Sequence, residues 1–382
     1  MNPALVPWAL SGGAAVSVGF ARFGYALILP AMQTDLNLNY AQAGWLNTAN
    51  ALGYLLGALL TLACVSRLGN RRIFVAGLAL TTAALLANGL THHFHLITLC
   101  RFLAGFGAAG AFICGGVLSG VLGTRAIVVF FSGGGIGMLT TGALLPWLFD
   151  AAGPASWPWA WIICAAICIP LSIAALVAMR DIQEPSTPGL RAQWSWRPCV
   201  PEFTAYFLFG LGYIAYMTFI IAWLRQSLNS SLSIAATTSI MWSLLGIMTL
   251  LAPLIWAPVF NGRRDGRPMA ASMTVLAIGA SLPLVLPTIT GLWLSAALVG
   301  SSVFMVPSAA TGFIKTNLPK PAWGSALAVA TSLFALGQAI GPVATGWISD
   351  LSDSLSTGLA ASSAILLVGV LIACTQKPLV SA

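Results

Sequence analysis

The sequence contains very little charge, since only 6 % of its 382 residues are Asp, Glu, Lys or Arg. A soluble protein carries roughly 25 % charged residues. The mean hydropathy of this chain is +0.92. The composition therefore excludes an ordinary soluble protein and predicts an integral membrane protein.

Several chemical motifs are also missing. The seven cysteines form no CxxC pair, so we expect neither a disulfide framework nor a metal site. No nucleotide-binding P-loop is present. The three histidines, His92, His93 and His95, stand together in one short connection without a nucleophile beside them. We therefore expect no enzyme activity and no cofactor.

Long apolar runs fill most of the chain, and most exceed the ~20 residues that a membrane-spanning helix needs. We expect an all-α membrane protein with twelve transmembrane helices. The predicted spans, numbered as segments 1 to 12, are 8–30, 41–65, 73–91, 96–121, 126–149, 157–179, 200–224, 233–258, 269–289, 291–314, 322–348 and 355–375.

The basic residues predict the orientation of these spans. Thirteen of the 16 Lys and Arg residues lie in the even-numbered connections or the C-terminal tail, and they are Arg67, Arg71, Arg72, Arg125, Arg180, Arg191, Arg197, Arg263, Arg264, Arg267, Lys315, Lys320 and Lys377. Basic residues favour the cytoplasmic side. Both termini are therefore expected in the cytoplasm, and the net charge of +8 reflects topology and not nucleic-acid binding.

The chain also contains an internal repeat. Residues 19–32 align without a gap with residues 210–223, so that Arg22 pairs with Tyr213. Such parallel repeats are typical of transporters built from two similar halves. We predict a six-helix bundle over 1–180, a cytoplasmic linker over 181–199 and a second six-helix bundle over 200–382.

Four motifs resemble signatures of the major facilitator superfamily. They are Ser66-Arg67-Leu68-Gly69-Asn70-Arg71-Arg72 after segment 2, Arg101-Phe-Leu-Ala-Gly105 in segment 4, Gly133-Gly-Gly-Ile-Gly137 in segment 5 and Gly337-Gln338-Ala-Ile-Gly341-Pro342 in segment 11. Ser66 replaces the acidic residue of the first signature. The Arg22-Phe-Gly-Tyr25 run and the Tyr40-Ala-Gln-Ala-Gly-Trp45 start of segment 2 are similar to the YbfB/YjiJ-type branch.

The resemblance implies the major facilitator fold, with segments 1, 4, 7 and 10 around a central cavity, and a transporter function. It also implies conformational or gating roles for Arg67, Gly69, Arg71, Arg72, Gly137, Gly341 and Pro342. Packing and topology are the alternative roles of these residues, because small residues let helices approach and Pro kinks them.

Arg22 is the sharpest functional signal, because a guanidinium inside a span costs ~2.5–3.5 kcal/mol and all eight acidic residues lie in connections or near span ends. Two interpretations remain open: it binds an anionic ligand, or it is a structural arginine bonded to carbonyl groups and water. The substrate-binding candidates are Arg22, Tyr25, Tyr213, Tyr216, Arg101, Asn47, Asn50 and Gln338.

We therefore predict a secondary active transporter that moves a small organic molecule, anionic in charge, by alternating access and linked to protons. A monomer in the bacterial cytoplasmic (inner) membrane is expected, with the substrate, protons and the lipid bilayer as partners. A drug/proton antiporter is the alternative, and a non-transporting membrane sensor is a remote one.

Overall fold

The computed structural model describes residues 5–180, 182–183, 194–227, 233–260 and 262–379, and within these ranges it is helical without a β-strand. The first half contains α1 (Val6–Ala14), the π-helix η2 (Ala15–Phe23), α2 (Gly24–Leu36), α3 (Tyr40–Leu68), α4 (Asn70–Asn88), α5 (Phe94–Val121), α6 (Thr124–Ala152) and α7 (Trp157–Met179). The second half contains α8 (Val200–Ser227), α9 (Ile234–Phe260), α10 (Arg267–Val285), α11 (Ile289–Ser302), α12 (Met305–Asn317), α13 (Trp323–Leu351) and α14 (Leu355–Cys374). Single 3₁₀ turns lie at Pro154–Ser156, Arg197–Cys199 and Lys320–Ala322.

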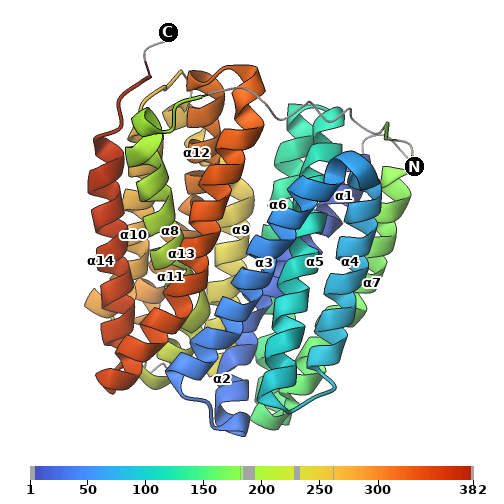
Figure 1. Ribbon diagram of the computed structural model, residues 1–382. Helices are drawn as coiled ribbons and strands as arrows, with labels where there is room; N and C mark the ends of the chain where they lie inside the picture. The colour runs from blue at the N-terminus through green and yellow to red at the C-terminus, as the bar shows by residue number, and fades with distance from the viewer. Residues whose placement is uncertain (1–4, 181, 184–193, 228–232, 261, 380–382) are drawn as a thin grey trace.

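The helices form two groups that lie side by side (Figure 1). We call α1 to α7 the N-terminal bundle and α8 to α14 the C-terminal bundle. In the first, α5 packs on α3 and α4, and α1 packs on α6 and α7; in the second, α8 packs on α13 and α14, and α11 packs on α9 and α10. The two chain ends lie at the same end of the molecule (Figure 1). Most of the predicted linker, 181–199, falls outside the described residues, so its boundaries stay a prediction.

Eleven helical segments of the described chain are long and apolar enough to cross a membrane. The first of these is continuous from Val6 to Leu36, and another combines α11 and α12 from Ile289 to Asn317. Helix α4 is not among them, although it packs between α5 and α7. Its 19 residues include Arg71 and Arg72 in the first turn, which lower its mean hydropathy. A count of twelve spans therefore stays a prediction.

Two of the spanning segments are interrupted near their middle. The first changes from α-helix to π-helix over Ala15–Phe23, where Gly19 lies so close to α6 that an added Cβ would be 2.6 Å from the Gly137 Cα. The other is broken between Ser302 and Met305. Pro307 follows this break and has no backbone N–H to donate to Val303, so the α-helical ladder cannot continue there. Broken helices expose backbone and redirect side chains, and they often form binding sites in transporters.

The two bundles meet mainly along two helix pairs, α3 with α13 and α6 with α9, and α2 also contacts α8. Both pairs approach closely through glycine. An added Cβ on Gly44 would lie 2.2 Å from the Pro342 carbonyl oxygen, and one on Gly135 would lie 2.8 Å from the Gly246 carbonyl oxygen. Small residues let the backbones come this close. The interface therefore depends on close packing of the helix backbones, and these helix pairs border the space between the bundles.

Candidate functional site

A cavity of about 860 Å³ lies between the two bundles. Its wall is mostly apolar and aromatic and comes from the π-helix η2 and from α3, α5, α6, α8, α9, α12 and α13, together with the break between α11 and α12. The cavity extends from Arg22 to Lys315 and Gly120, which lie near the helix ends on the side of the chain termini. This volume is within the ~300–1,000 Å³ of a small-molecule site.

Arg22 lines this cavity and is only 6 % exposed. Its Nε and Nη2 atoms are buried and have no hydrogen-bond partner among the described residues. The guanidinium carbon lies 5.4 Å from the centre of the Tyr54 ring, a cation–π contact. No Asp or Glu is among the described residues that line the cavity. Arg22 is therefore a buried cation without a carboxylate beside it in the described cavity wall.

The π-helical geometry of η2 explains which neighbours share the face of Arg22. An α-helical stripe through the first span would place Val18, Arg22 and Tyr25 together. Val18, Arg22 and Phe23 do line the cavity, whereas Tyr25 does not. The wider π-turn shifts the register by about one residue, so Tyr25 turns away into the N-terminal bundle.

Arg101 and Tyr25 belong to a buried cluster outside the cavity. The Arg101 side chain is fully buried and its Nη1 donates a hydrogen bond to the Ala21 carbonyl oxygen at 2.6 Å. Its guanidinium carbon lies 4.6 Å from the Tyr25 ring centre and 5.3 Å from the Trp161 ring centre. Tyr25 donates to the Ala43 carbonyl oxygen at 2.7 Å. In this conformation both predicted substrate contacts therefore hold the N-terminal bundle together.

Tyr213 and Gln338 do meet at the cavity wall. The Gln338 amide donates to the Tyr213 hydroxyl, and the Gln338 Oε1 atom is buried without a partner among the described residues. Tyr54, whose ring contacts the Arg22 guanidinium, lines the same cavity. Tyr216 points elsewhere and shares a 2.8 Å hydrogen bond with Ser295. Of the predicted substrate-binding residues, Arg22, Tyr213 and Gln338 thus line the cavity together.

Asn47 and Asn50 lie on α3 but outside the cavity wall. Asn47 donates to the Thr218 hydroxyl at 2.6 Å across the bundle interface, and Asn50 donates to the Arg101 carbonyl oxygen at 3.1 Å. The α3 residue that lines the cavity is Tyr54, which the sequence analysis did not select. Its position four residues after Asn50 on the same helical face was the available signal.

The bundles are in contact at the end of the cavity farthest from the chain termini. The Asp350 carboxylate, on α13, accepts hydrogen bonds from the backbone N–H groups of Tyr40 at 3.0 Å and Ala41 at 2.8 Å, at the start of α3. Thr48 donates to the Ala339 carbonyl oxygen at 2.7 Å in the same interface. Asp350 thereby caps a helix of the opposite bundle, where a negative charge is favourable. The predicted span 322–348 leaves Asp350 in a connection, and its contact with the start of α3 was not predicted from the sequence.

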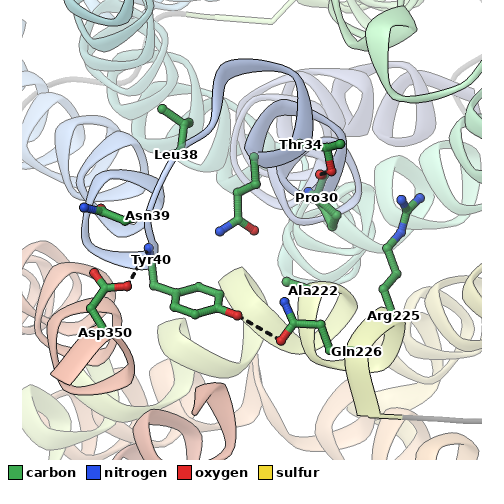
Figure 2. A pocket seen from close by; sticks show the side chains of 10 residues that line it. Pro30, Thr34, Leu38, Asn39, Tyr40, Ala222, Arg225, Gln226 and Asp350 are labelled. Atoms are coloured by element: carbon green, nitrogen blue, oxygen red, sulfur yellow. Dashed lines mark hydrogen bonds between the residues drawn. The ribbon is translucent and has the colours of Figure 1, made fainter. Parts of the chain in front are cut away.

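A second pocket, of about 350 Å³, lies at this closed end (Figure 2). Asp350 bonds the backbone of Tyr40 on one side of it, and the Tyr40 hydroxyl donates to Gln226 at 2.8 Å on the other. Arg225 stands beside Gln226 at the end of α8 (Figure 2). These contacts join α3, α8 and α13, and this pocket shares no lining residue with the larger cavity.

The predicted gating residues after α3 lie at the opposite end of the molecule. Gly69 adopts φ +79°, a conformation that L side chains rarely adopt, and so permits the turn between α3 and α4. Arg71 donates to the Arg180 carbonyl oxygen at 3.2 Å and to the Ile182 carbonyl oxygen, both after α7. Arg67 and Arg72 are exposed. Arg71 thus fixes the end of the N-terminal bundle, and a gating role for the group stays a prediction.

The predicted gating residues Gly137, Gly341 and Pro342 all lie where helices approach closely. Gly137 packs on Gly19 of the π-helix, and an added Cβ on Gly341 would lie 2.4 Å from the Leu211 carbonyl oxygen. Pro342 directs its carbonyl oxygen at Gly44 across the bundle interface. Packing accounts for these residues, and of these three contacts the one between Pro342 and Gly44 crosses the bundle interface and must change if the bundles move.

The arrangement of two helical bundles around a mostly apolar cavity with one buried cation defines a membrane transporter and not an enzyme. Residues 14–374 match the sequence model of a protein family described as "Uncharacterised MFS-type transporter YbfB". The chain therefore belongs to this family of the major facilitator superfamily, which confirms the resemblance predicted from its motifs.

Solved structures share this fold. The nucleoside transporter NupG superimposes with a TM-score of 0.72 at 14 % identity, covering 98 % of this chain and 98 % of that chain. A bacterial homolog to the human lysosomal transporter Spinster, in an inward-facing and unoccupied conformation, gives a TM-score of 0.69 at 14 % identity, with 98 % and 96 % coverage. At this identity the likeness shows the fold alone.

A curated relative is similar over a shorter stretch. The synaptic vesicle glycoprotein 2C of Rattus norvegicus is 27 % identical over 107 residues, which is 27 % of this chain. The match spans only 15 % of that protein's length. It is consistent with the transporter fold and does not identify a substrate.

Proposed function

We propose that this secondary transporter carries a small organic anion, which binds at Arg22 in the cavity between the bundles. The observation that carries the proposal is the buried guanidinium, whose Nε and Nη2 atoms have no partner among the described residues. A buried donor without an acceptor costs about 1–3 kcal/mol, and more when it is charged. Nε and Nη2 form one edge of the planar group, and a carboxylate can accept from both.

The like charge of Arg101 supports this proposal. Arg101 lies close enough for the two positively charged guanidinium groups to repel each other. A bound anion would offset this repulsion. A cationic substrate would add to it, and the described cavity wall offers no carboxylate to bind one. These charges favour anion transport over the export of cationic drugs.

The proposed cycle is alternating access, with the two bundles rocking about the site. We place the end with the chain termini and basic connections in the cytoplasm, because basic residues favour that side. The conformation described here is then inward-facing, since the contacts of Asp350 and Thr48 close the opposite end. We also propose that the protein works as a monomer in the bacterial inner membrane.

Proton linkage requires a group that can gain and release a proton, either on the protein or on the substrate. Asp35 accepts a 2.7 Å hydrogen bond from the Trp157 indole. Glu202 is 1 % exposed in the first turn of α8, and its Oε2 atom has no partner among the described residues. Glu202 therefore is the protein group best suited to exchange a proton, whereas a proton carried on the substrate requires no protein carboxylate.

The test is ligand-dependent stabilisation of the purified protein, with and without Arg22→Ala. We expect carboxylate-bearing compounds, but not amines of the same size, to raise the melting temperature of the native protein. Arg22→Ala should abolish this shift and anion uptake into proteoliposomes, and Arg22→Lys should retain less than about a tenth of the affinity because it lacks the planar fork. Arg263→Ala, which changes an exposed basic residue outside the cavity, is the matched control.

Undiminished anion transport by Arg22→Ala would remove Arg22 from the mechanism. Stabilisation by cationic compounds only, together with drug resistance on overexpression, would replace the proposal with drug/proton antiport.

A further inference from the structure

Four aromatic side chains form a stack along the cavity wall. Tyr206, Phe209 and Tyr213 come from α8 and Phe334 comes from α13, and all four line the cavity. Ring centres are separated by 4.8 Å between Tyr206 and Phe334, 5.4 Å between Phe334 and Phe209, and 4.5 Å between Phe209 and Tyr213. Their planes differ by only 5°, 8° and 11°. We call these four side chains the aromatic stack.

The aromatic stack is joined to the anion site at one end. Tyr213, its terminal member, accepts the hydrogen bond from Gln338 and lines the same cavity as Arg22. The wall that η2 and the α11–α12 break contribute is aromatic too, because Phe23 and Phe304 meet edge to face at 6.0 Å between ring centres. A molecule bound at Arg22 therefore has aromatic rings on more than one side.

We propose that the substrate is an aromatic carboxylate, in which a flat ring is joined to one carboxylate group by a short chain. This inference rests on the anion site proposed above. The carboxylate would bind Arg22, and the ring would pack against the aromatic stack, whose parallel rings favour another flat ring in an offset or edge-to-face arrangement. Arg22 and Lys315 are the basic residues of the described cavity wall, and they lie at opposite ends of the cavity. The site at Arg22 therefore matches a ligand with a single negative charge.

The size of the cavity agrees with this class of ligand. A volume of about 860 Å³ exceeds that of a small aliphatic acid and leaves room for a ring with substituents. The mostly apolar wall would pair poorly with the many hydroxyl groups of a sugar acid, because each buried hydroxyl requires a hydrogen-bond partner. The hydroxyls of Tyr213 and Tyr54 can serve one or two polar substituents.

The test compares three probes of similar size against the purified full-length protein in detergent. The probes are 3-phenylpropanoate, 3-cyclohexylpropanoate and 3-phenylpropan-1-ol, and their affinities are measured by titration calorimetry and thermal shift. They separate the ring from the charge. We expect 3-phenylpropanoate to bind about threefold to tenfold more tightly than the saturated acid, as aromatic pairing predicts, and the alcohol to bind more weakly than either acid.

A pair of variants locates the effect. Phe334→Leu should remove the preference for the aromatic acid over the saturated acid, whereas Phe131→Leu, which alters a cavity phenylalanine outside the aromatic stack, should preserve it. Both variants should retain the dependence of binding on Arg22. If Phe334→Leu does not fold, the three probes on the native protein still decide the question.

The two proposals fail in different ways. Equal affinity for the aromatic and saturated acids, with both lost in Arg22→Ala, would overturn the aromatic inference and leave the anion site intact. Tight binding of the alcohol, unaffected by Arg22→Ala, would overturn the anion site itself.

Discussion

Arg22 and Arg101 are both buried guanidinium groups in the N-terminal bundle, but they have different surroundings. Arg101 is held by the Ala21 carbonyl oxygen and by two aromatic rings, so in this conformation it holds the bundle together. Arg22 contacts the Tyr54 ring and borders the cavity. The sequence does not distinguish these two arginines, because both lie in apolar runs and both are followed by phenylalanine.

The tyrosines allow a direct test of this assignment. Tyr25→Phe removes the hydrogen bond to Ala43 and should lower the free energy of unfolding by about 1 kcal/mol, while anion affinity stays unchanged because Tyr25 lies outside the cavity. Tyr213→Phe should weaken anion binding, because it removes a hydroxyl from the cavity wall and the hydrogen bond that positions Gln338 there. Thermal unfolding and ligand titration measure both effects. Loss of binding in Tyr25→Phe alone would return Tyr25 to the substrate site.

At the scale of helices, the capping of α3 by Asp350 links the bundles at the closed end. Asn39 also caps this helix from within its own chain segment, since its side chain accepts from the Gln42 N–H at 2.8 Å. The start of α3 therefore stays capped if Asp350 moves away. This makes the Asp350 contact a reversible connection between α3 and α13, and not a requirement for folding.

Asp350→Asn should shift the population toward a conformation in which this end is open. The amide retains one acceptor but loses the negative charge near the start of α3, worth about 0.3–1 kcal/mol and up to ~2 kcal/mol when partly buried. We expect roughly twofold to thirtyfold faster labelling of a cysteine placed at Ala222, which is 2 % exposed beside the closed-end pocket. Asp353→Asn, in the same connection, is the control. An unchanged labelling rate would show that Asp350 does not hold this end closed.

At the scale of the whole molecule, the described cavity wall reaches the end with the chain termini, and the contacts of Asp350 and Thr48 join the bundles toward the other end. Ser308 is exposed on its wall, whereas Thr48 is buried in the contacts that close the other end. Two halves with equivalent helix pairs, α3 with α13 and α6 with α9, can exchange which end is closed. The model of alternating access therefore predicts accessibility from one side at a time.

Ser308→Cys should react with a membrane-impermeant maleimide from the cytoplasmic side, and a bound organic anion should slow the reaction. Cys64, Cys100 and Cys374 are replaced first, because they are not fully buried. Thr48→Cys in the same background should react only when the closed end opens. Equal labelling of Ser308→Cys from both sides in the absence of ligand would contradict an inward-facing resting state.

The sequence by itself determined the class of protein and its general architecture. Apolar runs of this length are accommodated by the lipid bilayer, so composition is sufficient to indicate membrane helices. The family motifs identified the superfamily. The sequence also indicated Arg22, Tyr213 and Gln338, because a polar side chain inside a span is costly unless it has a partner or a function.

The tertiary structure decided which of these polar groups meet. The π-helix turns Tyr25 away from Arg22, the packing of α5 buries Arg101 against Ala21, and the contact of the bundles occupies Asn47. Only the assembled helices bring Tyr54, Phe334 and Tyr213 to one wall. The direction of a side chain in a membrane bundle depends on helix breaks and glycine contacts between distant segments, and helical periodicity along one segment does not contain that information.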